Sequence, residues 1–240
     1  MLKPKEISGK LIEKIQRTPS VVSFRFFSED KLQFIAGQFL NVIFDESNLS
    51  NRELNKFLSF SSGPSKNYFE ITKRLSSSSF SDKLRNLKIN DRVKFKAPMG
   101  NCVLNSDIHK KTVFLVGGIG ITPVISIIEN EAEKNSFNDI ILFYANRSDE
   151  EIAFRKELDS FKNNLGKLKI YYIVSECKTG DKNCIVGNID KNVIIENVAD
   201  IAERFFFIFG PPGMVTSAKT ICAEIGCKND KILSESFMGY

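Results

Sequence analysis

The chain has 240 residues, of which 42% are hydrophobic and 26% are charged, a balance typical of globular proteins that bury a core. The composition excludes a disordered chain, and the length fits one large domain or two of ordinary size. No stretch approaches the roughly 20 consecutive apolar residues that a membrane-spanning helix needs, and the charged opening of the chain does not resemble a secretory signal. We therefore expect a cytoplasmic protein with no membrane span.

Positive charge is concentrated in the first half of the chain. Residues 1–108 carry 18 Lys and Arg against 11 Asp and Glu, a net charge of +7, whereas residues 109–240 carry 16 against 18, a net charge of −2. A basic half attracts anionic partners such as a phosphate-bearing cofactor or an acidic protein, although a solvated lysine-rich surface gives the same count. The basic residues are not interleaved with aromatic ones as in nucleic-acid-binding modules, so we expect no nucleic-acid partner.

The cysteines and the single histidine give no indication of a metal site. The five cysteines lack the close C-x2-C or C-x4-C-x2-C spacing of zinc and iron–sulfur sites, so we expect reduced thiols and no bound metal. His109 is expected at the surface, without a catalytic role.

The first half has the pattern of short antiparallel strands. Runs of β-branched and aromatic residues, separated by turn-rich stretches, predict strands at 21–27, 38–44, 56–61, 68–73 and 92–97. One helix is predicted at 80–87, after serines that are able to cap it. Regularly spaced short strands indicate a barrel or a sandwich.

From about residue 109 onward, apolar strands alternate with helices. Strands are predicted at 112–116, 139–145, 169–174 and 205–209, and helices at 122–134, 150–161 and 214–225. Continuous apolar runs indicate parallel strands that are buried on both faces. The predicted fold class is therefore α+β with two domains, an antiparallel β-barrel at 1–108 followed by a doubly wound parallel-sheet α/β domain at 109–240.

Two glycine-bearing loops follow apolar strands in the second half. The first loop, Gly117 to Gly120, leads into a helix at Thr122, and the second, Gly210 to Gly213, is followed by a helix that opens at Met214. Glycines let a ligand approach the backbone closely, and a helix N-terminus favours an anion such as a pyrophosphate. The first loop departs from G-x-G-x-x-G and by itself could be a tight connection. Two such loops at one sheet edge predict a dinucleotide site.

Three segments of the first half are each only weak indicators of function when taken alone: residues 34–39, 57–64 and 73–84. The serine run 76–79 most simply predicts a loop. Together with the second half, and in this order, the three segments resemble the ferredoxin-NADP reductase superfamily of two-domain flavoproteins. The matching stretches, between Arg17 and Tyr240, are AGQF at 36–39, LSFSS at 58–62, S-x-x-S-x-x-L at 78–84, LKINDRV at 87–93, APMGN at 97–101, GGIGITP at 117–123, FYANRSDEEIAF at 143–154, FGPPGM at 209–214 and ESF at 235–237.

The resemblance implies that FAD binds to the barrel. Lys56 stands where the family usually has an arginine on flavin phosphate, Leu58 where it has a flavin-stacking tyrosine, and Ser59 where a hydroxyl lies beside flavin N5. Ser78 replaces a family glycine beside the pyrophosphate. Lysine loses the two-pronged contact of arginine and leucine loses the aromatic stack, so flavin affinity is expected to be reduced. The expected flavin-binding residues are Lys56, Phe57, Leu58, Ser59, Phe60, Ser61, Ser78, Ser79, Phe80 and Ser81.

The resemblance also implies an NAD(P)H site in the second domain. Phe209 replaces a cysteine near the nicotinamide, and Glu235 and Phe237 match an acid and an aromatic residue beside the flavin. The expected residues are Gly118, Gly120, Thr122, Asn146, Arg147, Phe209, Gly210, Pro212, Met214, Phe237 and Tyr240. The candidate catalytic residues are Ser59, Glu235 and Phe237.

Two features of this half leave alternatives open. Arg147 lies at a strand end where Rossmann-like folds distinguish a ribose hydroxyl from a 2'-phosphate, so it favours NADPH over NADH, unless it only pairs with the acidic run 149–151. The tail 233–240 is expected to follow the last strand and to fold back as an aromatic lid through Phe237 or Tyr240, or else to pack only as a structural edge.

The predicted function is that of an FAD-dependent oxidoreductase that takes hydride from NAD(P)H and passes electrons to a separate carrier, namely ferredoxin, flavodoxin or an oxygenase component. One alternative is a reductase that uses flavin as a diffusing substrate. Another is a non-catalytic subunit that binds flavin or nucleotide and senses the redox state.

Overall fold

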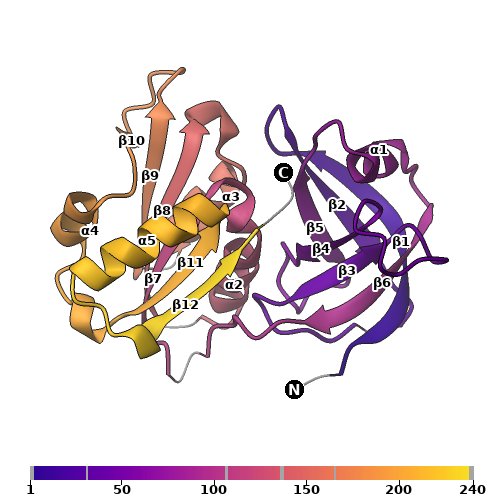
Figure 1. Cartoon of the computed structure of the whole chain (residues 1–240), viewed down its shortest axis with the longest axis horizontal. Coiled ribbons are helices and arrows are strands. Elements are labelled where there is room, and N and C mark those ends of the chain that lie inside the picture. The colour runs from indigo at the N-terminus through magenta and orange to yellow at the C-terminus, as the bar shows by residue number, and fades with distance from the viewer. Residues whose placement is uncertain (1–2, 31, 106–107, 136–137, 165, 238–240) are drawn as a thin grey trace. The chain divides into compact units, whose positions relative to one another are not determined.

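A computed structural model describes residues 3–30, 32–105, 108–135, 138–164 and 166–237. The chain divides into two compact units, one comprising Met1–Val103 with Thr122–Asn130 and the other comprising Leu104–Ile121 with Glu131–Tyr240 (Figure 1). In the described part of the chain, no helix is both long and apolar enough to cross a membrane.

The first unit is built on one antiparallel sheet. Its strands are β1 Lys5–Gln16, β2 Val21–Phe27, β3 Phe39–Ile43, β4 Asn55–Ser59, β5 Phe69–Arg74 and β6 Arg92–Met99. They are arranged in the order β4-β3-β6-β1-β2-β5 (Figure 1). The two outer strands of this order approach each other at an isolated bridge between Phe60 and Ile71, so the sheet nearly closes into a barrel.

Phenylalanines fill the interior of the barrel. The rings of Phe26 and Phe95 meet edge to face with centroids 4.9 Å apart, and Phe69 and Phe95 do the same at 5.0 Å. Such aromatic pairs contribute about 0.5–1.5 kcal/mol each beyond the burial of their area. Gly9 on β1 leaves space for them, because a Cβ there would lie 2.8 Å from the Phe95 ring.

Strand β1 is absent from the sequence-based prediction. Lysines and glutamates occupy many of its positions, and a register shift between Leu11 and Glu13 interrupts the alternation of buried and exposed residues. The exposed side of a barrel tolerates this pattern, which by itself does not distinguish a strand from a loop.

The predicted helix of the first unit is confirmed as α1, Ser79–Asn86. Ser78 caps it, since its side-chain oxygen accepts a hydrogen bond from the backbone N–H of Ser81. Phe80 and Leu84, four residues apart and therefore on one helix face, are completely buried in the barrel core. Apolar packing thus fixes the helix on the barrel.

The second unit contains a parallel sheet. Its strands are β7 Lys111–Gly117, β8 Asp139–Ser148, β9 Leu168–Glu176, β10 Cys184–Val186, β11 Phe205–Gly210 and β12 Ile232–Ser236. Their order is β10-β9-β8-β7-β11-β12, and each neighbouring pair runs parallel. The carboxyl ends of the strands therefore meet at one edge, which is where open α/β sheets bind ligands.

The longer helices that follow the parallel strands in sequence are α2 Ile121–Glu133, α3 Arg155–Asn164, α4 Lys191–Asn197 and α5 Pro212–Glu224, and Thr122–Asn130 of α2 belongs to the first unit. Helix α3 contacts β9, and α5 lies across one face of the sheet against β11 and β12 (Figure 1). The antiparallel barrel and the parallel sheet with its helices confirm the predicted two-domain fold class.

Two expectations for this unit are corrected, namely the start of one helix and the position of the last strand. The helix expected at 150–161 begins at Arg155, because Ile152 and Phe154 are buried in non-helical backbone and Phe154 has a φ of 59°. The strand at 205–209 is not the last, because Ile232–Ser236 forms β12 alongside it. The tail therefore begins as a paired strand and not as a free segment.

Candidate functional site

In the first unit, the neighbouring strands β3 and β4 bring together two buried polar groups that lack partners. Their register pairs Phe39 with Ser59 and Asn41 with Phe57, and residues that face each other in an antiparallel pair point to the same side of the sheet. The Ser59 hydroxyl and the Asn41 side-chain oxygen are buried, and neither has a hydrogen-bond partner among the described residues. A buried group without a partner costs about 1–3 kcal/mol, so a ligand that supplies one would bind favourably.

The remaining residues of β4 provide an apolar surface and a cation. Phe57 is 62% exposed and meets Phe39 edge to face, while Leu58 packs against the barrel core. Lys56 lies opposite Val42, on the other side of the strand from Phe57. Ser59, Asn41 and Phe57 lie on one side of the strand pair, and an aromatic cofactor ring that hydrogen-bonds through its polar edge fits this combination.

A buried lysine that the sequence analysis did not assign lies near Lys56. Lys73 on β5 is only 7% exposed, and burial lowers its pKa, with the positive charges of Lys56 and Arg74 lowering it further. Neither Lys56 nor Lys73 has an acidic partner in the described part of the chain. Like charges brought together in a buried position favour an anionic ligand, and phosphate is the anion that a nucleotide cofactor carries.

The serines before α1 are engaged with one another. The Ser78 hydroxyl, besides capping the helix, lies 3.1 Å from the Ser81 hydroxyl, and the backbone N–H of Ser76 donates to Ser81 at 3.1 Å. Ser78 and Ser79 are exposed, whereas Ser81 is buried. A helix N-terminus of this kind, a few residues after Lys73 in sequence, adds favourable backbone dipoles for an anion.

Three of the expected flavin-binding side chains have structural roles instead. Phe60 and Phe80 are completely buried in the barrel core, so only their backbone atoms can touch a cofactor. The Ser61 hydroxyl donates to Glu70 at 3.0 Å and lies 2.7 Å from the Thr72 hydroxyl, inside a buried polar network. The sequence pattern did not separate these inward-facing positions from Lys56, Leu58 and Ser59.

In the second unit, the two glycine loops pack directly against each other. A Cβ at Gly120 would lie 2.4 Å from the Phe209 carbonyl oxygen, and a Cβ at Gly210 would lie 2.7 Å from the Met214 sulfur. Gly118 has a φ of +52° and open space where a side chain would be, so its backbone is accessible. Close packing on one side and bare backbone on the other suit a loop that receives a phosphate group.

The residues that flank these loops have different environments. Thr122 is buried at the start of α2, whereas Pro212 is exposed at the first position of α5. Met214 is partly buried and lies against both Gly117 and Gly210.

Asn146 and Arg147 lie at the carboxyl end of β8. The register pairs Ala145 with Gly117, so Asn146 follows directly beside the first glycine loop. Asn146 is 8% exposed, and both polar atoms of its side-chain amide are buried without a hydrogen-bond partner among the described residues. This side chain therefore fits a ligand that both donates and accepts hydrogen bonds.

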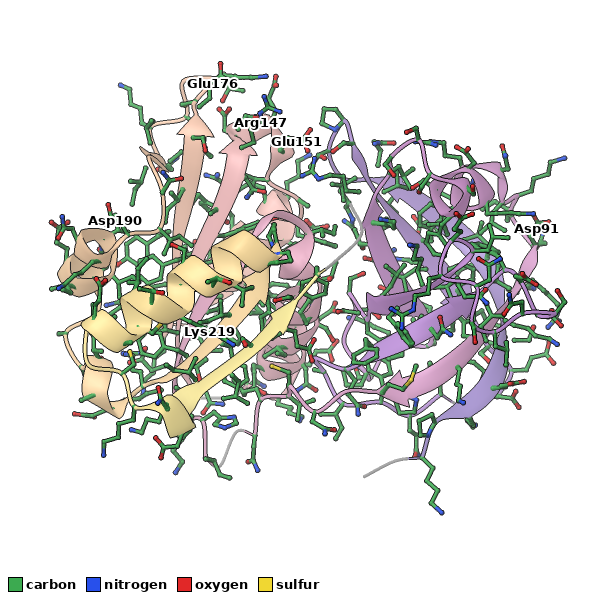
Figure 2. All side chains as sticks on the ribbon, in the orientation of Figure 1. Asp91, Arg147, Glu151, Glu176, Asp190 and Lys219 are labelled. Atoms are coloured by element: carbon green, nitrogen blue, oxygen red, sulfur yellow. The ribbon has the colours of Figure 1, made fainter. Side chains whose placement is uncertain are left out.

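Arg147 is exposed at the same end of the sheet, and Figure 2 shows it in the region of Glu151 and Glu176. The acidic run after it has other partners, because Asp149 accepts hydrogen bonds from Thr179 and Glu150 lies 3.9 Å from Lys178. Within the described ranges Arg147 forms no ion pair, so its guanidinium is available to an anionic ligand.

Strand β12 brings the C-terminal residues to the glycine loops. Glu235 is paired with Phe209 in register, and the backbone N–H of Phe237 donates to the Gly210 carbonyl at 2.9 Å. The rings of Phe209 and Phe237 are 6.4 Å apart between centroids. Phe209 is completely buried, and Tyr240 lies outside the described residues. Burial raises the pKa of Glu235 to about 7, so this carboxyl is partly protonated near neutral pH.

His109 is partly buried and not simply at the surface. Its ring packs against Phe205 and Phe207 with centroid distances of 4.5 and 5.2 Å, and burial lowers its pKa. These contacts give the histidine a packing role at the start of the second unit.

Two protein families match the chain. Residues 8–104 match the oxidoreductase FAD-binding domain, and residues 114–220 match the oxidoreductase NAD-binding domain. The cofactors are therefore FAD and a nicotinamide dinucleotide, and the unpartnered groups at Ser59 and Asn146 each lie inside one matched segment.

Individual relatives extend over nearly the whole chain. The flavohemoprotein of Bacillus subtilis (strain 168) is 26% identical over 240 residues, which cover 97% of this chain and 60% of that protein. NADH-cytochrome b5 reductase 1 of Mortierella alpina is 25% identical over 234 residues, which cover 93% of this chain and 76% of that protein. The chain thus spans about 60% of the length of the flavohemoprotein that it matches.

The fold is also found in a solved structure. The crystal structure of a mutant ferredoxin-NADP+ reductase from Plasmodium falciparum is similar with a TM-score of 0.80, covering 97% of this chain and 96% of that one. At 18% sequence identity, this likeness shows the fold alone.

Proposed function

The chain belongs to the ferredoxin-NADP reductase superfamily of FAD- and NAD-binding oxidoreductases, and from this premise we propose that it takes hydride from NAD(P)H and passes electrons to a separate carrier protein. FAD, when bound, accepts a hydride from the nicotinamide and releases electrons singly. The residues of the chain bind and orient the two cofactors and exclude water from them. We assign FAD binding to residues 1–108 and NAD(P)H binding to residues 109–240.

The proposed FAD site lies on the barrel. Lys56 and Lys73 neutralise the diphosphate, with the N-terminus of α1 nearby in sequence, and this role explains why Lys73 is buried beside other cations. Ser59 and Asn41 hydrogen-bond the polar edge of the flavin ring, and Phe57, on the same side of β4, provides an apolar contact. The missing partners of Ser59 and Asn41 support this placement.

The proposed NAD(P)H site lies at the carboxyl edge of the parallel sheet. The accessible backbone of Gly118 receives the pyrophosphate, and Gly120 holds the loop against Phe209. Asn146 hydrogen-bonds the nucleotide, and Arg147 pairs with a 2'-phosphate, which favours NADPH. The absence of an ion-pair partner for Arg147 among the described residues supports that preference.

Glu235 and Phe237 are the proposed catalytic residues of the second unit. A carboxyl with a pKa of about 7 is divided between its two protonation states near neutral pH, so it donates or accepts a proton without a large cost. Phe237 supplies an aromatic face next to Phe209, and we propose that it covers the flavin until the nicotinamide displaces it.

The proposed acceptors are one-electron carriers. Ferredoxin, flavodoxin and the oxygenase component of a multicomponent system are the acceptors that the family resemblance implies. The names of the two curated relatives add a haem protein as a further candidate. Reduction of a diffusing flavin, and a non-catalytic redox-sensing role, are the competing proposals.

The observation that carries the proposal is the presence of an unpartnered buried polar side chain in each matched domain, Ser59 in the FAD-binding segment and Asn146 in the NAD-binding segment. The test is to load the protein with FAD, desalt it, and follow NAD(P)H oxidation with ferricyanide as the acceptor. We expect retained flavin and sustained oxidation. Flavin lost on desalting but reduced when it is added freely would support the diffusing-flavin alternative, and no oxidation at all would support the non-catalytic one.

A further inference from the structure

Helix α5 ends in a hydrogen-bonded turn that reverses the chain. The backbone N–H of Cys227 donates to the Cys222 carbonyl at 2.9 Å, and that of Gly226 donates to the Ala223 carbonyl at 3.2 Å. Gly226 has a φ of +83°, the left-handed conformation that this pair of bonds requires. Together these features define the Schellman motif of helix C-termini.

The motif brings two particular side chains together. In a Schellman turn, the residue after the left-handed glycine frequently packs against the residue at the start of the outer hydrogen-bonded turn. Here these residues are Cys227 and Cys222, and both belong to the apolar cluster under α5. The two thiols lie close enough that each shifts the pKa of the other. The backbone geometry of the helix end therefore places the two cysteines side by side.

The two thiols differ in exposure and in acidity. Cys222 is completely buried, and its hydrogen bond to Cys227 together with burial raises its pKa. Cys227 is partly exposed, and the hydrogen bond that it receives from Cys222 lowers its pKa. The more exposed cysteine of the two is thus also the one that forms a thiolate more readily, and the thiolate is the reactive form of cysteine.

We propose that Cys222 and Cys227 are a redox modification site that closes to a reversible disulfide when peroxide reaches Cys227. The Cys227 thiolate attacks one peroxide oxygen, the O–O bond breaks, and the sulfur becomes a sulfenic acid with release of one water molecule after protonation. The Cys222 sulfur then displaces the sulfenic oxygen as a second water molecule and forms the S–S bond. Two thiols are oxidised, one hydrogen peroxide is reduced, and a dithiol reductant reverses the reaction.

The other cysteines of the second unit provide an internal comparison. Cys177 and Cys184 both direct their sulfurs to Asp181, at 3.8 Å from its backbone oxygen and 3.5 Å from its carboxylate, respectively. Burial raises the pKa of the Cys184 thiol. Their sulfurs thus contact oxygen atoms of the same aspartate, so we expect slower oxidation at this pair than at Cys222 and Cys227.

The site is independent of the proposed electron transfer, because it needs neither FAD nor a nucleotide. It lies at the C-terminal end of α5, whereas the glycine loop lies at the N-terminal end of the same helix. The closed disulfide would tie the last turn of α5 to the segment that leads into β12.

The test uses the full chain, reduced with dithiothreitol, desalted and treated with hydrogen peroxide. The protein is then denatured in N-ethylmaleimide and digested with trypsin, which releases Cys222 and Cys227 in one peptide, residues 220–228. We expect this peptide without label and lighter by two hydrogens, and we expect both labels to return after dithiothreitol. The double variant C177S/C184S should give the same result.

Two outcomes would overturn the proposal. One is peptide 220–228 carrying two labels after peroxide treatment that oxidises other cysteines of the chain. The other is Cys227 oxidised to a sulfinic acid while Cys222 is still labelled, because a neighbouring thiol in contact would have trapped the sulfenic acid first. In C222S, the Cys227 sulfenic acid should instead persist long enough to react with dimedone.

Discussion

The two units of this chain prepare for a ligand in different ways. The barrel relies on side chains, with a buried cation at Lys73 close to the cation of Lys56, and unpartnered polar atoms at Ser59 and Asn41. The parallel-sheet unit relies chiefly on backbone, with Gly118 open and Gly120 pressed against β11. Unpaired polar and charged side chains destabilise the ligand-free barrel, and a ligand that pairs with them removes this cost. The backbone site instead requires that no side chain occupy its space. Substitutions should therefore have opposite effects on stability in the two units.

The largest effect is expected for Gly120→Ala. Its new Cβ would lie 2.4 Å from the Phe209 carbonyl, a contact that backbone atoms cannot avoid without moving the loop. We expect a loss of about 1–3 kcal/mol in the free energy of unfolding, and a decrease in NAD(P)H-dependent flavin reduction of about 100-fold or more. Urea unfolding and stopped-flow reduction measure the two quantities.

The matched control is Gly213→Ala, because Gly213 lies in α5 with open space around its Cβ position. Alanine should stabilise the helix there by about 0.4–1 kcal/mol. Equal destabilisation by both substitutions would contradict the close packing of the first loop against Phe209.

Lys73→Met should have effects of opposite sign on stability and on cofactor binding. Removing a buried cation from the neighbourhood of Lys56 and Arg74 should raise the free energy of unfolding of the FAD-free protein by about 1 kcal/mol or more. FAD affinity should fall by about tenfold or more, because one charged contact to phosphate is lost. Lys96→Met, at an exposed position of β6, should change neither quantity noticeably. Unchanged FAD affinity in the Lys73 variant would remove this lysine from the site.

Glu235→Gln should alter the pH dependence of stability. The pKa of this carboxyl is raised from 4.5 in the unfolded chain to about 7 in the folded protein, so the folded state retains a proton that the unfolded state releases. Its contribution to stability is therefore largest below pH 4.5 and is lost as the pH rises to about 7. The glutamine variant should lack this decline, whereas Glu224→Gln, at an exposed position of α5, should retain it. Parallel pH profiles for E235Q and the parent would show that the carboxyl is not buried.

The smallest expected effect concerns nucleotide preference. Arg147→Ala should lower kcat/KM for NADPH by about tenfold and leave that for NADH within about twofold, because only NADPH carries the 2'-phosphate. Lys219→Ala, an exposed cation of α5, should change neither value (Figure 2). An equal loss for both nucleotides would place Arg147 outside the phosphate site.

The difference between the backbone site and the side-chain site also determines which residues the sequence can predict. Gly118 and Gly120 were recognisable as part of a ligand-binding loop, because several glycines follow directly after an apolar strand in the sequence. Lys73 was not assigned, because its burial and its proximity to Lys56 depend on the near-closure of the barrel between β4 and β5. Asn41 was missed for the same reason, since its lack of partners is a property of the folded environment.

Elements that depend on distant partners were also difficult to predict. Strand β12 has a mixed sequence and forms because β11 offers it a free edge, so the tail was expected to be unpaired. The proximity of Cys222 and Cys227 is local, but it depends on the left-handed conformation of Gly226 and has no spacing signature of its own. The order of motifs did predict the family, because each motif is local.

The central claim is that the two units hold FAD and NAD(P)H so that hydride passes between them. Anaerobic stopped-flow mixing of the FAD-loaded protein with NADPH, and in parallel with NADH, tests it most directly. The account predicts bleaching of the flavin absorbance at a rate that saturates with nucleotide concentration, and a decrease of about tenfold or more in apparent nucleotide affinity in Asn146→Ala. Flavin that stays oxidised with both nucleotides in the parent protein would contradict the account.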